Sequence, residues 1–141
     1  MKDNIQFFLK EAGQSACYTL CLIRVAEKYL KKDLDVVKAM QIGIEKRCID
    51  YKDGDPEYED NFYVRCPETF LFYLTGVHWE VRKETYPYNA RKGEYVINRY
   101  ERQRTGCISA HFEMDDFHPI ANSLTVKCGR IASVRVLRAV K

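Results

Sequence analysis

Cys17 and His111 are the residues whose types and positions best suit nucleophilic catalysis in this sequence. Cys17 opens a stretch with helical spacing, and in the first turn of a helix the positive end of the helix dipole favours the thiolate, which is the nucleophilic form. His111 lies far along the chain in a segment with the alternation of a strand, where an imidazole can act as a base. The sequence therefore predicts a Cys/His pair, with a Cys17 thiol of lowered pKa that alkylates faster than the other five cysteines at about pH 6 to 7.

The first half of the chain has the spacing of helices. After Ser15, which suits an N-cap, apolar residues recur every three or four positions and predict a helix over residues 16–31. A second helix is expected from Asp35 until just before Cys48. A third is expected between Pro67, which opens it, and Gly76, which closes it. Residues 50–60 contain six acids with one glycine and one proline, a composition typical of a solvated loop.

From residue 77 onward the period of the sequence changes to two. Strands are expected over residues 77–81, 95–100, 107–114, 124–128 and 131–137, with a tight turn at Gly129. Within 107–114 the apolar residues share one face and His111 lies on the other. Trp79 is expected in the core, and residues 90–104 are expected to form a hairpin with a solvated face. Helices followed by strands predict an α+β fold in which N-terminal helices pack on a C-terminal antiparallel sheet.

Composition narrows the possible functions. A chain of 141 residues has room for one hydrophobic core, which predicts a single domain over residues 1–141. The formal net charge of +3 is too near neutral for a dedicated nucleic-acid binder, and residues 16–30 are too short and too charged to span a membrane. The N-terminus has no recognisable secretory signal, so we expect a cytoplasmic protein with reduced thiols. The cysteine spacing does not fit a structural zinc site and no cofactor motif is found, so neither a metal nor a cofactor is expected.

Three stretches of the chain together resemble a known class of protein. They are residues 13–22 (GQSACYTLCL), the pair His111 and Phe112, and residues 117–136, which run from FHPIANSLTVK through Gly129 to SVRV. These stretches are similar to small bacterial and phage papain-like domains related to the double-glycine leader peptidases of bacteriocin exporters. The resemblance implies a papain-like cysteine peptidase fold with Cys17 as nucleophile and His111 as general base, acting without a cofactor on a peptide or protein substrate.

The sequence departs from that pattern at two positions. The residue that orients the catalytic histidine is expected to be Asp or Asn in the segment after the histidine strand, and this chain has His118 there. His118 can accept or donate a hydrogen bond but supplies no fixed negative charge, and Asp116 is the alternative. The glutamine that donates to the oxyanion is expected about two helical turns before the cysteine, and Gln14 lies three residues before it.

Three functions follow from this sequence. The first is a cysteine peptidase or amidohydrolase that uses Cys17 and His111 to hydrolyse a peptide or amide bond. The second is a papain-like domain that is weakened as a catalyst and acts as a binding module, because the acid expected at position 118 is a histidine. The third is an accessory protein of a phage or mobile element that contacts nucleic acid through residues 91–104.

Overall fold

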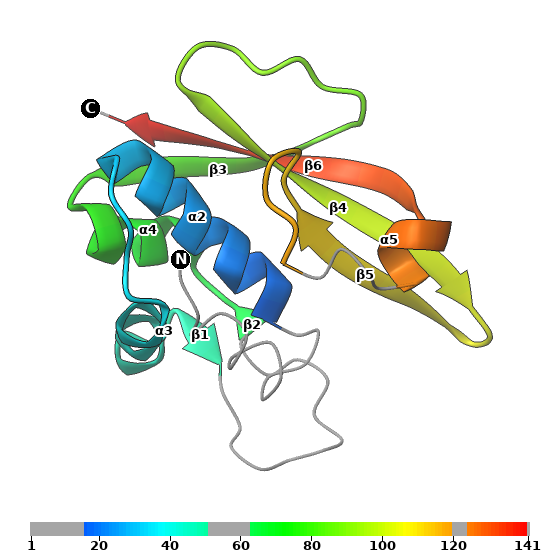
Figure 1. Ribbon diagram of the computed structural model, residues 1–141, viewed down its shortest axis with the longest axis horizontal. Coiled ribbons are helices and arrows are strands. Elements are labelled where there is room, and N and C mark those ends of the chain that lie inside the picture. Colours follow the sequence, from blue (N-terminus) through cyan, green and yellow to red (C-terminus); the bar gives the residue numbers. More distant parts are fainter. Residues whose placement is uncertain (1–15, 51–62, 120–123, 141) are drawn as a thin grey trace.

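The helices come first in the chain and the strands of the main sheet follow them (Figure 1). The computed structural model describes residues 16–50, 63–119 and 124–140. Its helices are α2 (Cys17–Leu30), α3 (Val36–Glu45), α4 (Pro67–Thr75) and α5 (Leu124–Cys128). Its strands are β1 (Ile49–Asp50), β2 (Tyr63–Val64), β3 (His78–Glu84), β4 (Glu94–Arg104), β5 (Cys107–Glu113) and β6 (Arg130–Val140). The predicted α+β class, with N-terminal helices and a C-terminal antiparallel sheet, is confirmed.

The two ends of helix α2 each lie within one residue of the ends predicted from the sequence. Its apolar residues are fully buried, Leu20 and Ile23 among them, so the spacing read from the sequence marks the face that enters the core. Ala16 takes the N-cap position and offers no side-chain hydrogen bond to the first turn. Ser15, the expected cap, lies outside the described residues. Cys17 is therefore the first residue of the helix itself, as its proposed role requires.

The next two helices also follow their sequence signals. The side chain of Asp35 accepts a hydrogen bond from the backbone N–H of Lys38 at 3.1 Å and caps α3. Pro67 opens α4, where its missing N–H costs nothing. Gly76 closes α4 with a φ of 82°, a left-handed conformation that glycine adopts without strain. These two helices pack beside α2 and complete the helical layer (Figure 1).

The main sheet has the strand order β3, β6, β4, β5, and every pairing in it is antiparallel. Trp79, Ile97 and Leu137 lie on one face, which we call the helix face because these residues join the helices in the core. The prediction that Trp79 belongs to the core is confirmed. The opposite face, which we call the outer face, carries His111 opposite Tyr100. β5 lies at an edge of the sheet, so one side of its backbone is open to α2.

Two of the predicted elements are wrong. Residues 124–128 (LTVKC) were expected to be a strand and form the short helix α5, because a segment of five residues is too short for its period to decide between helix and strand. Residues 90–104 were expected to form a hairpin, whereas residues 94–104 make one long strand between β6 and β5. The turn of the hairpin comes later, at Gly106, whose φ is 78°.

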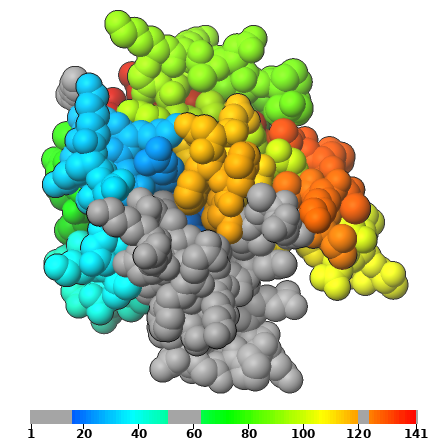
Figure 2. Space-filling view, viewed as in Figure 1, coloured from blue at the N-terminus to red at the C-terminus, as the bar shows by residue number. Residues whose placement is uncertain are grey.

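The helix α2 runs along the open edge of β5 and the turn that follows it. The ring of Tyr18, near the start of α2, lies 4.5 Å from the ring of Phe112. Near the end of the helix, the ammonium of Lys28 donates to the carboxylate of Asp116. Figure 2 shows the same neighbours on the surface, where the amber atoms of the β5 end and its turn meet the blue atoms of α2. The helix that carries Cys17 and the strand that carries His111 are therefore packed directly together.

None of the helices in the described part of the chain is long and apolar enough to cross a membrane.

Candidate active site

The thiol of Cys17 lies against the backbone of β5. Its Sγ accepts a hydrogen bond from the backbone N–H of Phe112 at an N to S distance of 3.4 Å. That N–H belongs to the peptide unit that joins His111 to Phe112, so standard peptide geometry puts the sulfur within about 6 Å of the Cα of His111. The structure thus places the Cys17 thiol beside the backbone of His111, although the two residues are 94 positions apart in the sequence.

The side chain of His111 projects to the outer face of β5, since that of its neighbour Phe112 packs on Tyr18 at the helix face. Only 2% of the surface of His111 is exposed. Burial lowers its pKa below the ordinary value of 6.5, because taking the imidazolium out of water disfavours the charged form. At neutral pH the imidazole is therefore uncharged, which is the form that can accept a proton.

The pKa of Cys17 is the opposite of what the sequence predicts. Burial leaves 4% of the residue exposed and raises the pKa of the thiol to about 11. The backbone N–H groups of Phe112, Tyr18 and Cys17 itself each lower that pKa, so the expected effect of the helix start is present. Burial outweighs these donors, and the resting residue is a neutral thiol.

The structure places the candidates for the third catalytic position apart from one another. The Nδ1 of His118 lies 3.0 Å from Oε1 of Glu113. The carboxylate of Asp116 is exposed and binds Lys28, which holds its pKa below the usual value. The carboxylate of Asp115 accepts from the Asn98 side chain at 2.9 Å. Gln14, the candidate oxyanion donor, lies outside the described residues.

Glu113 is a functional candidate that the sequence analysis missed. It is 6% exposed and occurs two residues after His111, so the two side chains share the outer face of β5. Its carboxylate lies beside the imidazole of His118. The alternation in residues 107–114 could have identified it, because that alternation already groups Glu113 with His111. The side chain of Glu113 is thus in place to hold the ring of His118.

No metal site is apparent in residues 16–50, 63–119 and 124–140, because they contain no group of three or more His, Cys, Asp or Glu side chains able to hold an ion. All six cysteines are free thiols. Cys17 and Cys21 share α2, Cys107 lies on β5 and Cys128 on α5, while Cys48 precedes β1 and Cys66 precedes α4.

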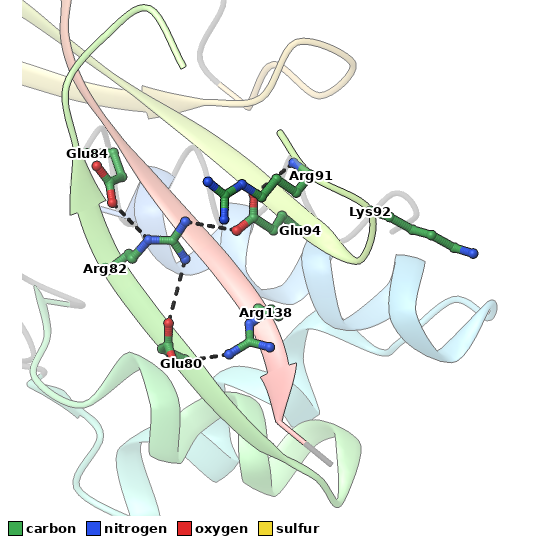
Figure 3. Close-up of a pocket in the computed structure, with 7 residues that line it drawn as sticks. All are labelled: Glu80, Arg82, Glu84, Arg91, Lys92, Glu94 and Arg138. Carbon is green, nitrogen blue, oxygen red and sulfur yellow. Dashed lines mark hydrogen bonds and ion pairs between the residues drawn. The ribbon is translucent and has the colours of Figure 1, made fainter. Parts of the chain in front are cut away.

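A separate charged hollow of about 580 Å³ lies on the outer face at the other end of the sheet (Figure 3). Its centre is Arg82, whose guanidinium binds Glu84 at 2.9 Å and Glu94 at 2.8 Å. Hydrogen bonds from the Arg91 backbone and from Arg82 lower the pKa of Glu94 to about 2. Arg138 is in turn paired with Glu80 at 3.4 Å. The acids of this hollow already engage its central cations, so the arrangement fits a structural ion-pair network better than a ligand site.

Comparisons of the chain with protein-family models, with curated protein sequences and with solved structures give no match.

Proposed function

We propose that the protein is a papain-like cysteine hydrolase that cleaves a peptide or amide bond, with Cys17 as nucleophile and His111 as general base. The observation that carries this proposal is the hydrogen bond from the Phe112 N–H to Cys17 Sγ. It fixes the thiol at the start of a helix and beside the strand position that bears a buried, uncharged imidazole. The helical layer packed on an antiparallel sheet supports the papain-like assignment.

The two neutral side chains suit a mechanism in which the proton moves as the bond forms. Cys17 Sγ attacks the acyl carbon while its proton passes to His111, and the C–N bond then breaks as the amine leaves with that proton. Water next attacks the thioester and gives a proton to His111. The C–S bond breaks, the carboxylic acid is released and the thiol recovers its proton. The backbone N–H groups of Cys17 and Tyr18 face the sulfur and suit the stabilisation of developing negative charge.

His111 is oriented in this proposal by His118, which is itself held by the Glu113 carboxylate. Asp116 is a weaker candidate for that role, because it is exposed and bound to Lys28. A histidine paired with a buried acid can keep one tautomer and one ring orientation, which a histidine alone does not do.

Acylation by p-nitrophenyl acetate tests the proposal. We expect a burst of nitrophenolate and an acetyl group that peptide mass spectrometry locates on Cys17. Cys17→Ser and His111→Gln should each lower that acetylation by about 100-fold or more, the range found for loss of a general base. Cys107→Ser is the matched control, because this thiol is exposed and lies away from the site. Acetylation of Cys17 that is unchanged in His111→Gln would refute the proposed pair.

A binding module is the second candidate, and the burial of Cys17 favours it. A thiol with a pKa of about 11 that is 4% exposed is poorly placed for attack unless substrate binding opens the site. If Cys17 acquires no acetyl group although the exposed Cys107 does, this second function becomes the better account.

A further inference from the structure

Arg135 lies on the helix face of β6, opposite Ile97 of β4, and its guanidinium reaches toward Phe112 on β5. Its guanidinium carbon is 5.7 Å from the centre of the Phe112 ring, and the ring of Tyr18 lies 4.5 Å from that same ring. Phe112 is also the residue whose N–H binds Cys17 Sγ. We call Tyr18, Phe112, Arg99 and Arg135 the arginine platform. It is a continuous set of contacts that leads from the thiol to two guanidinium groups.

Of the two arginines of this platform, Arg99 is paired with an acid and Arg135 is not, among the residues that the structure describes. Arg99 lies directly opposite Phe112 on β4 and binds Glu101. Arg135 donates to the hydroxyl of Ser133 at 3.1 Å, and among the described residues it has no ion pair with an acid. Burial and the nearby positive charge of Arg135 both lower the pKa of Arg99, so the two cations lie close enough to repel each other. Arg135 lowers the pKa of Tyr18 and Glu68 raises it, so both charges lie near that ring. No ion pair joins Glu68 to Arg135 in the described structure.

This arrangement differs from the charged hollow at the other end of the sheet. There Arg82 is bound by Glu84 and Glu94, so an incoming anion would have to displace a carboxylate (Figure 3). The guanidinium of Arg135 lies over the Phe112 ring. No acid among the described residues forms an ion pair with it. A half-buried arginine of this kind is a good receptor for a carboxylate, because two parallel N–H groups match its two oxygens.

We propose that the arginine platform binds a carboxylate of the substrate, so that the protein acts on acidic peptides whose Glu or Asp side chain lies next to the bond that Cys17 attacks. Arg135 is the principal contact and Arg99 supports it. This inference rests on the proposed function, since it names the class of substrate for the same thiol. Neutral peptides of the same shape would bind less well, because they leave the repulsion between the two cations uncompensated.

Two alkylating peptides that differ by a single charge test the inference. They are the α-amides of N-iodoacetyl-glutamate and N-iodoacetyl-glutamine, which extend roughly 7 Å from the sulfur when attached. Peptide mapping by mass spectrometry gives the rate at each cysteine, and the exposed Cys107 and Cys128 are internal references. Cys107 is a stringent reference because Arg104 is its partner across the strands. We expect the glutamate reagent to modify Cys17 about fivefold faster than the glutamine reagent, relative to these references.

Substitutions of Arg135 and of a control arginine test whether Arg135 is responsible for the preference. Arg135→Gln should remove the preference at Cys17, and Arg135→Lys should restore part of it by returning the charge without the fork. Arg138→Gln is the matched control, because Arg138 lies on the same strand but on the outer face, paired with Glu80. It should keep the full preference. Thermal unfolding checks that each variant is folded. A preference that survives in Arg135→Gln, or no preference in the unchanged protein, overturns the inference while leaving the proposed function intact.

A second measurement covers the case in which Cys17 reacts with neither reagent, which would count against the proposed function. The N-acetyl forms of the same two amides are titrated into the Cys17→Ser protein and the backbone amide signals are followed by NMR. We expect the glutamate compound to shift the signals of Phe112 and Arg135 more than the glutamine compound, and Arg135→Gln to abolish that difference. Equal shifts with both compounds would refute carboxylate binding without reference to catalysis.

Discussion

Cys17 is subject to two opposing influences on its ionisation. Backbone N–H groups at the start of α2 and in β5 favour the thiolate, while removal from water favours the thiol. The second influence wins, so the resting site holds a thiol and an uncharged imidazole instead of an ion pair. The pKa of His111 lies below 6.5, so the imidazole can act as a base at neutral pH. Activity should be lost in acid as His111 becomes protonated.

The stability of the protein should fall in alkaline solution because of Cys17. Its pKa is raised in the folded state from 9.0 to about 11, so the stabilisation from the neutral thiol is complete below pH 9 and is lost as the pH rises through 11. The loss should reach roughly 2 to 3 kcal/mol. Urea unfolding at pH 8 and at about pH 10.5 measures it. The stability advantage over Cys17→Ala should shrink at the higher pH, whereas Cys107→Ala, at an exposed site, should show no such change.

Glu113 and Asp116 provide a matched test of the third catalytic position. Glu113→Gln should lower the acetylation of Cys17 about tenfold, because it loosens His118. Asp116→Asn should change it less than about twofold, since a surface pair with Lys28 contributes about 1 kcal/mol of stability at most. The effect of Glu113→Gln should vanish in a His118→Gln background if the carboxylate acts through His118. Additive effects of the two substitutions would show instead that Glu113 acts by another route.

At the residue level, the sequence predicts candidate residues, but it does not predict the surroundings of their side chains. The types of Cys17 and His111 and their expected elements are enough to pair them, and the structure packs those elements together. The direction of the Cys17 pKa could not be predicted, because it depends on how deeply the helix start is covered. The pairing of Glu113 with His118 depends on a turn, and the approach of Arg135 to the Phe112 ring depends on strand register, and local sequence patterns contain neither.

Among the elements, α2 and β5 are the pair that positions the site. The open edge of β5 supplies the N–H that holds the thiol, and the aromatic contact between Tyr18 and Phe112 fixes the distance between helix and strand. The helices α2, α3 and α4 were predictable because each has a long apolar period or clear signals at its ends. The helix α5 was not predictable, because its five residues include strand-forming types and are too few to show a helical period.

Gly129 joins α5 to β6, and its lack of a side chain is needed there. A Cβ at this position would run into the carbonyl oxygens of Thr125 and Glu101, both of them backbone atoms that cannot rotate away. Gly129→Ala should therefore cost roughly 3 kcal/mol of the free energy of unfolding. Gly93→Ala is the control, since Gly93 has a φ of 83° but no atom within 4 Å of an added Cβ. It should cost about 1 kcal/mol, as backbone strain alone would. Equal losses in urea unfolding would contradict the close approach.

Across the whole molecule, the six cysteines sample every depth of the fold. Cys107 and Cys128 are exposed, Cys66 is half-buried, and the other three are buried, Cys21 completely. This distribution changes the expectation drawn from the sequence, in which Cys17 alkylates faster than all the others. Accessibility alone puts Cys17 among the slow thiols. Any reactivity above that level must come from the chemistry of its site.

Pulse labelling with iodoacetamide at neutral pH separates accessibility from activation. Cys107 and Cys128 should be modified first, and Cys21 and Cys48 should be modified only as the core opens, because 0% and 1% of their surfaces are exposed. Cys17 is 4% exposed, so its accessibility alone predicts a rate close to those of Cys21 and Cys48, and we expect assistance from His111 to raise the rate well above theirs. His111→Gln should return Cys17 to the rate of the two buried thiols, while all six should react alike in concentrated urea. If Cys17 matches Cys21 in the unchanged protein, the thiol is a packing residue and the hydrolase proposal fails.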